Sequence, residues 1–424
     1  MATDGQQPEE ATASSALPKK QGYLYLFLSL HLPAVAMGLG QGITTPVLPI
    51  FARDEFNVGV ALAAYLFVAQ MLGGMTASIP AGYAIDRWGR RRILLAGPLI
   101  TAAALFLTAT AQSFAMLLVF RFIAGWGQQM WMLSRLTVIA DRGGGARGRQ
   151  ITSMFGIQRL GLLAGPLIGG VTAEMWGLRV PFVLHGIVAL LAVIPSFFVV
   201  QETNPRGQQR ARRASTGEGP GDEFSWKMLL RHPIPILYTA QLLSTATRGG
   251  AIGGGTVFLF AAYVFNVEAL DLAFLSSAAA LAGVPLTLSA GYIMDRFGRK
   301  VTVVPGLTLF SFSMVWFATI AFNGWPYWTF VAGFVWMQLL GAMLSGSMQT
   351  IGTDLAPPQA RGRFFGVGRM VSQAGFMSNP LSFSALIALS GYTAAFGFLA
   401  ITGFASAAIL AFLIKESLMK DDER

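Results

Sequence analysis

The chain of 424 residues contains no cysteine, only three histidines, and charged residues at just 12% of its positions. Without cysteine it has neither a disulfide framework nor a thiolate metal site, and three histidines are too few for a histidine-rich metal site. A soluble domain carries about 25% charged residues, so this sequence lacks the polar surface that a soluble globular fold needs. We expect no cofactor and no bound metal.

Apolar side chains are in excess, at 54% of positions, and they are accompanied by 49 glycines. Apolar runs of about 20 residues can cross ~30 Å of hydrocarbon as helices, and glycine lets such helices pack closely in lipid. We therefore predict an all-α membrane protein of twelve transmembrane helices. The predicted spans are residues 23–48, 60–83, 93–111, 114–138, 151–173, 180–200, 234–262, 270–293, 301–322, 327–350, 364–388 and 392–414.

Two polar stretches divide the chain. Residues 1–22 are predicted to form a disordered cytoplasmic tail, since no basic-then-apolar pattern of a cleaved signal peptide begins at Met1. Residues 201–233 are predicted to form a solvated linker. The linker separates two six-helix bundles, residues 23–200 and 234–416, and a second tail follows at 417–424.

The positive charges are distributed very unevenly over the predicted loops. Of the 30 lysines and arginines, 23 fall in the tails, the linker and the even-numbered loops, whereas the odd-numbered loops hold only Arg53 and Arg179. Because basic residues stay on the cytoplasmic side, both termini and the linker are predicted to be cytoplasmic, in a plasma or inner membrane. The net charge of +10 then faces anionic lipid headgroups, and we expect no nucleic-acid partner.

An internal repeat runs through the sequence. The segment Gly82–Arg91 recurs 209 residues later as Gly291–Lys300, with seven of ten positions identical or both basic. Ala146–Arg149 recurs as Ala360–Arg363 at an offset of 214. Self-similarity of this kind indicates that a six-span unit has been duplicated.

The loop Gly-x-x-x-Asp-Arg-x-Gly-Arg-Arg, present twice between predicted spans, resembles the signature of the major facilitator superfamily of transporters. The resemblance extends over nearly all of residues 23–416 and implies two bundles that rock about a central cavity. It also implies that the loop latches the cytoplasmic side in the outward-open state through charge-assisted hydrogen bonds of Asp86; the alternative is a plain turn. The glycines would allow a tight turn and close helix approach. The gating candidates are Gly82, Asp86, Arg87, Gly89, Arg90, Arg135, Asp295, Arg296, Gly298 and Arg299.

The fifth predicted span is similar to a motif of the efflux branches of this family, the drug/proton antiporters. Its residues are Gly161, Gly165, Pro166, Gly169 and Gly170. The glycines would let this span press on a neighbouring helix, and the proline would bend it. The resemblance implies export, and ordinary glycine packing is the alternative.

None of the 20 acidic residues lies deep inside a predicted span, whereas five arginines do. Intramembrane charge is costly and is usually tied to a pathway or a partner. Arg135 and Arg369 lie near predicted cytoplasmic helix ends, where they could pair with Asp86, Asp141 or Asp354, so a structural role is favoured for both. The three deeper arginines, Arg121, Arg159 and Arg248, lack a buried acid and are candidates for binding an anionic substrate.

Polar residues at helical spacing follow the first, fourth, seventh and tenth predicted spans. By the family resemblance these are the spans that line the cavity. Each such residue could also be an ordinary interhelical hydrogen bond, but four stripes on these four spans favour binding. The substrate-binding candidates are Arg121, Arg248, Arg159, Gln41, Gln128, Gln241, Gln338 and His31.

We interpret the chain as a secondary active transporter, not an enzyme, that works by alternating access as a monomer. The resemblance implies proton-coupled efflux of an amphipathic or organic-anion small molecule. Without a buried carboxylate, the proton would have to be carried by His31, His185, Asp54 or Glu55. An uptake or exchange permease for an organic anion is the first alternative, and a non-transporting sensor is a less favoured one. No Walker-type loop occurs, so ATP is not the predicted energy source.

Overall fold

The computed structural model describes residues 27–141, 147–199, 230, 232–252, 255–344, 348, 351–352, 355 and 361–414. Within these ranges the side chains of a few residues, among them Asp86 and Asp295, fall outside the description. Every regular element in the described residues is a helix, so the predicted all-α class is confirmed. The predicted tails and most of the predicted linker lie outside these residues.

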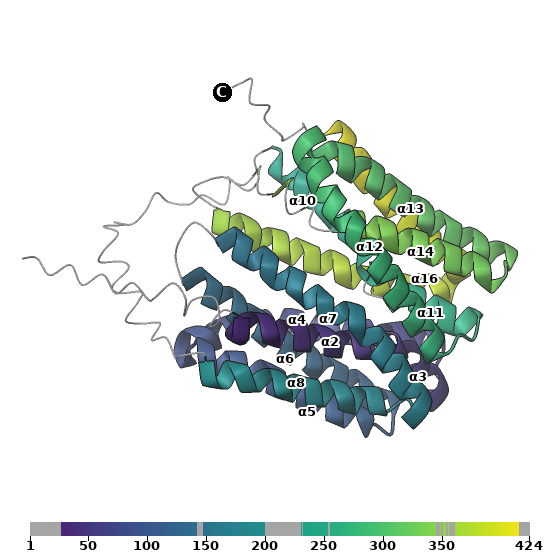
Figure 1. Cartoon of the computed structure of the whole chain (residues 1–424). Helices are drawn as coiled ribbons and strands as arrows, with labels where there is room; N and C mark the ends of the chain where they lie inside the picture. The colour runs from purple at the N-terminus through teal and green to yellow at the C-terminus, as the bar shows by residue number, and fades with distance from the viewer. Residues whose placement is uncertain are drawn as a thin grey trace, which may run out of the picture.

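The helices fall into two consecutive groups (Figure 1). The first group consists of a short helical turn η1 (Phe27–His31) and helices α2 (Leu32–Thr44), α3 (Val47–Phe56), α4 (Val60–Trp88), α5 (Arg90–Ala109), α6 (Phe114–Asp141), α7 (Arg147–Trp176) and α8 (Val180–Val199). The second group consists of α10 (Ile234–Ile252), α11 (Gly255–Val264), α12 (Ala269–Phe297), α13 (Arg299–Asn323), α14 (Tyr327–Met343) and α16 (Arg361–Phe412). We call these groups the first and second parts of the molecule.

The first predicted span requires a correction. It was expected to end at residue 48, but the structure breaks the helix at Thr45 and Pro46 and continues it as α3 to Phe56. Pro46 has no backbone N–H to donate to the preceding turn, which favours a break, and α2 and α3 meet at an angle of 41°. The helical segment therefore extends eight residues beyond the expected end.

Six of the described helices are long and apolar enough to cross a membrane, or seven if the bent pair of α2 and α3 is one span. Two shorter apolar helices, α11 and α14, occur as well. Helix α16 is long because it covers two predicted spans, and it contains one non-helical residue, Gly391, with φ 82° and ψ −178°. That residue lies between the predicted ends at 388 and 392.

The backbone repeats itself at the offsets found in the sequence. Left-handed φ angles occur at Asn57 (50°) and again 209 residues later at Asn266 (53°). Gly89 (φ 94°) and Gly298 (φ 110°) are also 209 residues apart, and Gly177 (φ 95°) and Gly391 (φ 82°) are 214 apart. Equivalent turns therefore have equivalent backbone geometry in the two parts, as expected from a duplicated unit.

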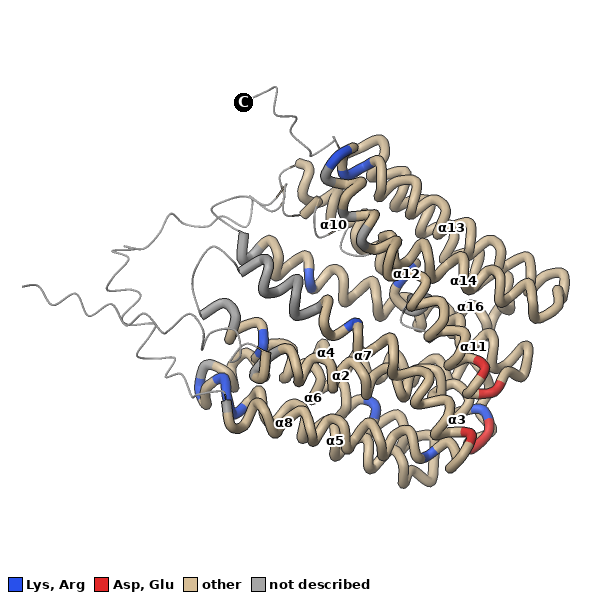
Figure 2. Tube along the Cα trace, in the orientation of Figure 1, with Lys and Arg blue, Asp and Glu red and all other residues tan. Residues whose placement is uncertain are grey.

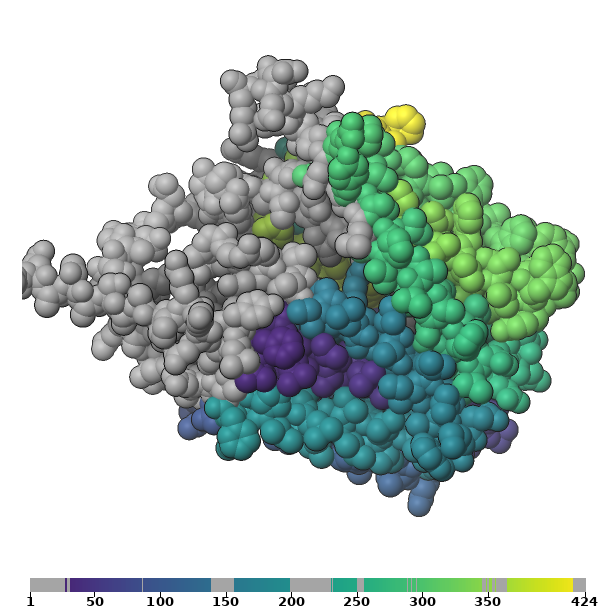
Figure 3. Space-filling view, viewed as in Figure 1, coloured from purple at the N-terminus to yellow at the C-terminus, as the bar shows by residue number. Residues whose placement is uncertain are grey.

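Each part has its own internal packing, and a few helices join the two. In the first part α2 packs on α7 and α8, and α6 packs on α4 and α5; in the second part α16 packs on α10 and α13. The parts meet where α7 contacts α12, α4 contacts α16, and α11 contacts α3 and α4. Figure 3 shows α7 (blue) directly beside α12 (green).

The described charges are separated along the molecule (Figure 2). One end, which we call the acidic end, carries Asp54, Glu55, Glu268 and Asp271 beside α3 and α11. The opposite end, the basic end, carries the turns between α4 and α5 and between α12 and α13, with Arg87, Arg90, Arg91, Arg296 and Arg299. Further blue segments lie part-way along the helices with no red segment beside them.

Candidate functional site

Arg121 lies inside the first part and is held by a neighbouring glutamine. On α6 its side chain is 6% exposed, and Nη2 donates to Oε1 of Gln70 on α4. Gln70 in turn donates from Nε2 to Oε1 of Gln128 at 2.8 Å. The backbone of Gly125 also packs against Gln70, because a Cβ there would meet the Gln70 carbonyl oxygen at 2.0 Å. This stretch of the predicted α6 stripe therefore faces α4.

Arg135 is the most deeply buried arginine of the five, with no exposed surface. Its guanidinium carbon lies 4.0 Å from the ring centroid of Trp131, a cation–π distance. Nη1 donates to Oε1 of Gln158 on α7 at 3.4 Å. The acids considered as its partners, Asp86, Asp141 and Asp354, lie outside the described side chains. Its described contacts join α6 to α7.

Arg248 lies on α10, and the helix around it is fixed by α16. Asn379 Nδ2 donates to the carbonyl oxygens of Ala246 at 2.5 Å and Thr247 at 3.2 Å. Arg248 Nη2 donates to the carbonyl oxygen of Leu344 at 3.2 Å, while its Nε is buried without a hydrogen-bond partner. A guanidinium has five N–H donors, so this side chain retains donors for another acceptor.

Arg159 lies on the face of α7 that is turned toward the second part. It precedes Gly170 by eleven residues, about three turns, so both are on one side of the helix. Gly170 packs on α12, where a Cβ would meet that of Ala273 at 2.4 Å. Arg159 itself is exposed. Among the described side chains the ion pairs are Arg53–Asp54 and Arg179–Glu55, so neither Arg159 nor Arg248 has a recorded carboxylate partner.

The other candidates differ in how they are used. Gln241 donates to Ser372 Oγ at 2.6 Å and to the Gly368 carbonyl at 3.3 Å, so it is occupied within the second part. Gln41 and Gln338 are half-buried. His31 is half-buried and lies against Phe27, with ring centroids 6.4 Å apart.

His185 is a buried polar residue that the predicted stripes did not include. It lies on α8, and its Nδ1 is 3.2 Å from Thr44 Oγ1 on α2. Its ring also lies against Gly40, where a Cβ would come within 2.0 Å. A glycine on α2 thus makes room for the imidazole, a relation that the spacing of either helix alone does not show.

The glycines of α7 set how closely it approaches α2. A Cβ on Gly161 would meet the Val35 carbonyl oxygen at 2.2 Å, and one on Gly169 would meet that of Ile43 at 2.0 Å. Gly165 lies between them, 2.4 Å by the same measure from the Leu39 carbonyl oxygen, and Pro166 is part of this contact. Gly170 packs on the second part, so the motif serves two interfaces.

We expect Gly165→Ala to lower the thermal unfolding midpoint of the detergent-purified protein. The added methyl group would overlap α2 backbone atoms, and overpacking of this kind costs about 1–3 kcal/mol. Gly82→Ala is the matched control, because it also lies in a helix but a Cβ there meets nothing within 4 Å. Ala is the better helix former, so the control should be neutral or stabilising. Equal midpoints for the two variants would contradict the close packing.

The same space around Gly82 corrects an expectation. Gly82 was predicted to allow close helix approach, but it lies within α4 with open space around it. The tight turn resides instead in Gly89 and Gly298, whose positive φ angles favour glycine.

The described contacts of the two signature loops stay within single helices. Arg87 Nη1 donates to Tyr83 Oη at 3.0 Å, and Arg296 Nη1 donates to Tyr292 Oη at 2.7 Å. These are equivalent bonds in the two repeats, 209 residues apart. Asp86 and Asp295 fall outside the described side chains. Arg87 and Arg296 therefore form no recorded contact between the parts in this conformation.

The parts are joined instead at the acidic end, by a residue that the sequence did not single out. Arg53 Nη1 donates to the carbonyl oxygen of Ala262 and to Oδ1 of Asn266, the latter at 3.2 Å. Tyr263 Oη donates to the Val58 carbonyl at 2.7 Å. Because Arg53 and Ala262 are 209 residues apart, equivalent segments of the two repeats touch here. One signal was available: Arg53 is one of only two basic residues in the odd-numbered loops.

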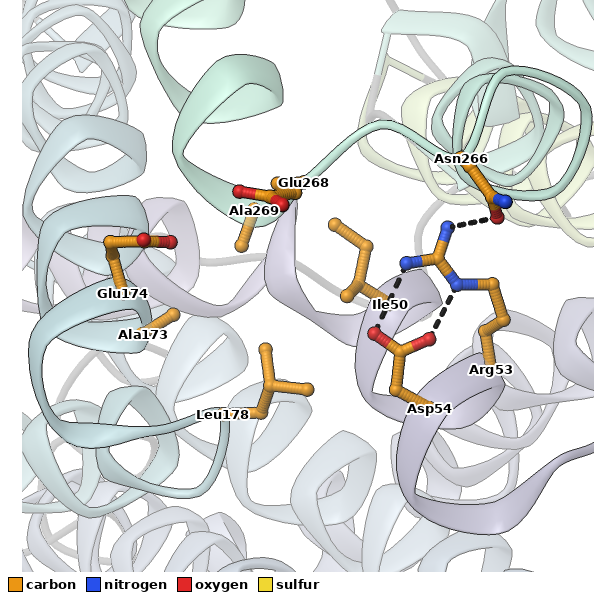
Figure 4. A pocket seen from close by; sticks show the side chains of 9 residues that line it. All are labelled: Ile50, Arg53, Asp54, Ala173, Glu174, Leu178, Asn266, Glu268 and Ala269. Atoms are coloured by element: carbon orange, nitrogen blue, oxygen red, sulfur yellow. Dashed lines mark hydrogen bonds and ion pairs between the residues drawn. The ribbon is translucent and has the colours of Figure 1, made fainter.

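A hollow of about 530 Å³ lies beside this contact. Figure 4 shows Arg53 paired with Asp54 and bonded to Asn266, with Glu174 and Glu268 across the opening. Arg53 Nε and Asp54 Oδ1 are 2.5 Å apart. Two carboxylates, Glu174 and Glu268, have no recorded cation here, so the hollow is unfavourable for an anion. The site for an anion must be sought among the arginines deeper in the molecule.

Comparison with known proteins gives consistent results. A family model described as Major Facilitator Superfamily matches residues 31–290 and 243–423. Multidrug resistance protein MdtG of Proteus mirabilis (strain HI4320) is 26% identical over 385 residues, which are 87% of this chain and 90% of the relative. Quinolone resistance protein NorA of Staphylococcus aureus (strain MRSA252) is 24% identical over 325 residues, 74% of this chain and 79% of the relative.

Solved structures give the same architecture. A crystal structure of D-xylose-proton symporter matches with a TM-score of 0.72 at 16% identity, over 93% of this chain and 99% of that chain. Peptide transporter POT in complex with sulfate matches with a TM-score of 0.71 at 15% identity, over 91% and 93%. At these identities the likeness shows the fold alone.

Proposed function

Because the chain belongs to the major facilitator superfamily, a family of multi-pass membrane transporters and not of enzymes, we propose that it exports an amphipathic organic anion by alternating access. The named relatives MdtG and NorA are resistance proteins for multiple drugs and for quinolones, which supports efflux. The observation that carries the anionic preference is the set of membrane-depth arginines with no recorded carboxylate beside them, above all Arg248 with its unpartnered Nε.

The proposed topology is twelve spans in two six-helix bundles with both termini cytoplasmic. It is supported by helices at the predicted positions, by the break of α16 at Gly391, and by the bend between α2 and α3. The basic end would then be cytoplasmic and the acidic end external. The bundles would be residues 23–200 and 234–416, with 201–233 as the linker, in a monomer.

Single cysteines at Arg92 and Asn323 should react with a membrane-impermeant maleimide from opposite sides. Both residues are exposed, Arg92 at the basic end and Asn323 at the end of α13, and the chain has no other cysteine. In sealed cells Asn323→Cys should be labelled and Arg92→Cys protected until the membrane is permeabilised. Labelling of both in intact cells would contradict the topology.

The proposed substrate site lies between the parts. Arg121, Arg159 and Arg248 provide positive potential there, and Gln41, Gln128, Gln241, Gln338 and His31 are proposed as its polar lining. Each charge-assisted hydrogen bond to a substrate anion would contribute roughly 1.5–3 kcal/mol. Apolar side chains around these groups would accommodate an amphipathic body.

The proposed direction of transport is outward. At the acidic end an anion meets Glu174 and Glu268, and the potential of such a mouth repels it. Repulsion there slows entry from outside and disfavours rebinding after release, which suits an exporter better than an uptake permease. The α7 glycine motif, which resembles that of efflux branches, gives the same direction.

Proton coupling is proposed with His185, Asp54, Glu55 or His31 as the carrier, since no carboxylate among the described side chains lies deep in a helix. The test is transport by purified protein in liposomes, with and without a pH gradient, across a panel of aromatic carboxylates, sulfonates and neutral analogues. Gradient-driven transport of the anions is expected. Transport that ignores the gradient but requires an anion on the other side would show an exchanger, and transport of only neutral or cationic compounds would refute the anionic preference.

A further inference from the structure

Two of the membrane-depth arginines are placed on opposite sides of the interface between the parts. Arg159 is on α7 of the first part, on the same face as Gly170, which contacts α12 of the second part. Arg248 is on α10 of the second part. The two guanidinium groups are close enough to repel each other electrostatically. No other pair of the five arginines combines opposite parts with a recorded mutual repulsion.

The surroundings leave this repulsion uncompensated. The described ion pairs are both at the acidic end, and the recorded partner of Arg248 is a neutral carbonyl, that of Leu344. Like charges in a medium of low dielectric repel strongly, and a buried charge without a counter-charge is costly. A chain that keeps two such charges facing each other gains most from a mobile anion between them.

Arg121 and Arg135 differ in this respect. Arg121 is bound by Gln70 and Arg135 by Gln158 and the Trp131 ring, and all these residues belong to the first part. They can raise the local positive potential, but neither reaches across the interface. Arg248 is held in direction by the two hydrogen bonds of Asn379 to the adjacent backbone, so its unpartnered Nε is presented by a rigid helix.

We propose that Arg159 and Arg248 form a clamp, with one arm in each part, for a single oxyanion group of the substrate, a carboxylate or a sulfonate. The clamp rests on the proposed transport function and adds to it the chemical group that is recognised and the two residues that recognise it. A guanidinium fork matches the two oxygens of such a group. With the anion bound, repulsion between the parts becomes attraction through the shared anion, so that binding is coupled to their approach. An anion held by one part alone would have no such effect.

The clamp predicts a specific pattern of affinities for the matched probes 1-naphthoate and 1-naphthamide, which differ in charge but little in shape. Binding to the purified full chain is measured by calorimetry for wild type, Arg159→Gln, Arg248→Gln and the double variant. Each single variant should bind naphthoate roughly tenfold more weakly or worse, with naphthamide unchanged. Because the two arms act on one group, the double variant should lose little more than either single variant. Arg369→Gln, which removes another exposed membrane-depth arginine, is the control and should bind as wild type does.

Several results would overturn the clamp. If the losses of the single variants multiply in the double variant, the arginines act on separate sites. If wild type prefers naphthoate and the variants keep that preference, the clamp is wrong while anion transport stands. If wild type does not prefer naphthoate, both the clamp and the anionic substrate are refuted, whereas transport of neutral compounds in liposomes would still support a transporter.

Two further measurements guard against variants that fail to fold. Arg159→Lys and Arg248→Lys keep the charge but lose the planar fork, so they should weaken naphthoate binding less than the glutamine variants do. In the cysteine-free chain, cysteines at positions 159 and 248 should be joined by a flexible bis-maleimide, and naphthoate bound to wild-type arginines should be displaced by no neutral analogue. Absence of cross-linking in folded protein would contradict the placement of the two arms.

Discussion

Arg53→Ala is expected to open the acidic end and to expose residues that are buried between the two parts. The substitution removes the hydrogen bonds of Arg53 to the Ala262 carbonyl and to Asn266. Hydrogen bonds of a charged group contribute about 1.5–3 kcal/mol each, so the equilibrium between closed and open acidic ends should shift roughly tenfold or more. Tyr263 and Val58 would remain as a weaker neutral contact.

The reporter for this shift is a cysteine at Ser384, which is 2% exposed and donates to the Ala61 carbonyl of the first part at 2.7 Å. Its rate of labelling by an impermeant maleimide should rise roughly tenfold or more in the Arg53→Ala background. Arg179→Ala is the matched control. Arg179 lies at the same end and pairs with Glu55 at 2.8 Å, but both belong to the first part. Equal acceleration in both backgrounds would mean that Arg53 supports only local structure.

Asp86→Asn is expected to reduce transport strongly while leaving the thermal unfolding midpoint nearly unchanged. The resemblance assigns Asp86 to a latch that closes the basic end when the acidic end opens. In the conformation described here the acidic end is closed, and Arg87 and Arg296 bond only to tyrosines of their own helices. Loss of the charge would remove charge-assisted hydrogen bonds from the opposite conformation alone, with an expected loss in rate of roughly tenfold or more.

Asp295→Asn provides the comparison within the same protein, since Asp295 is the repeat equivalent of Asp86. We expect a smaller loss for Asp295→Asn. Combining Arg53→Ala with Asp86→Asn should partly restore transport, because the two changes bias the same equilibrium in opposite directions. Wild-type rates in Asp86→Asn alone would mean that the loop is only a turn.

The fold followed from the sequence because its determinants are local. Apolar length placed the helices, and the repeat offsets of 209 and 214 recur in the backbone angles of Asn57 with Asn266 and of Gly177 with Gly391. The misplaced end of the first span has a local cause as well. Pro46 was read as part of an uninterrupted run, but it starts a second helix, α3, at an angle to α2.

The contacts of the site could not be predicted, because they depend on which faces of distant helices meet. Arg121 was placed on a cavity stripe by its spacing, yet Gln70, which occupies it, lies 51 residues away on α4. Likewise, nothing in the spacing of Arg53 shows that it touches its own repeat equivalent, Ala262. Glycine spacing on α7 predicted close packing but not that Gly170 would face the second part.

The most direct test of a carrier for organic anions is counterflow in liposomes containing only this protein. Liposomes are loaded with unlabelled 1-naphthoate and diluted into labelled 1-naphthoate without any pH gradient. A carrier that alternates its access is expected to accumulate label transiently above its equilibrium level, and Arg248→Gln should abolish this overshoot. Label that enters without an overshoot in wild type, or that overshoots equally with naphthamide, would contradict the account.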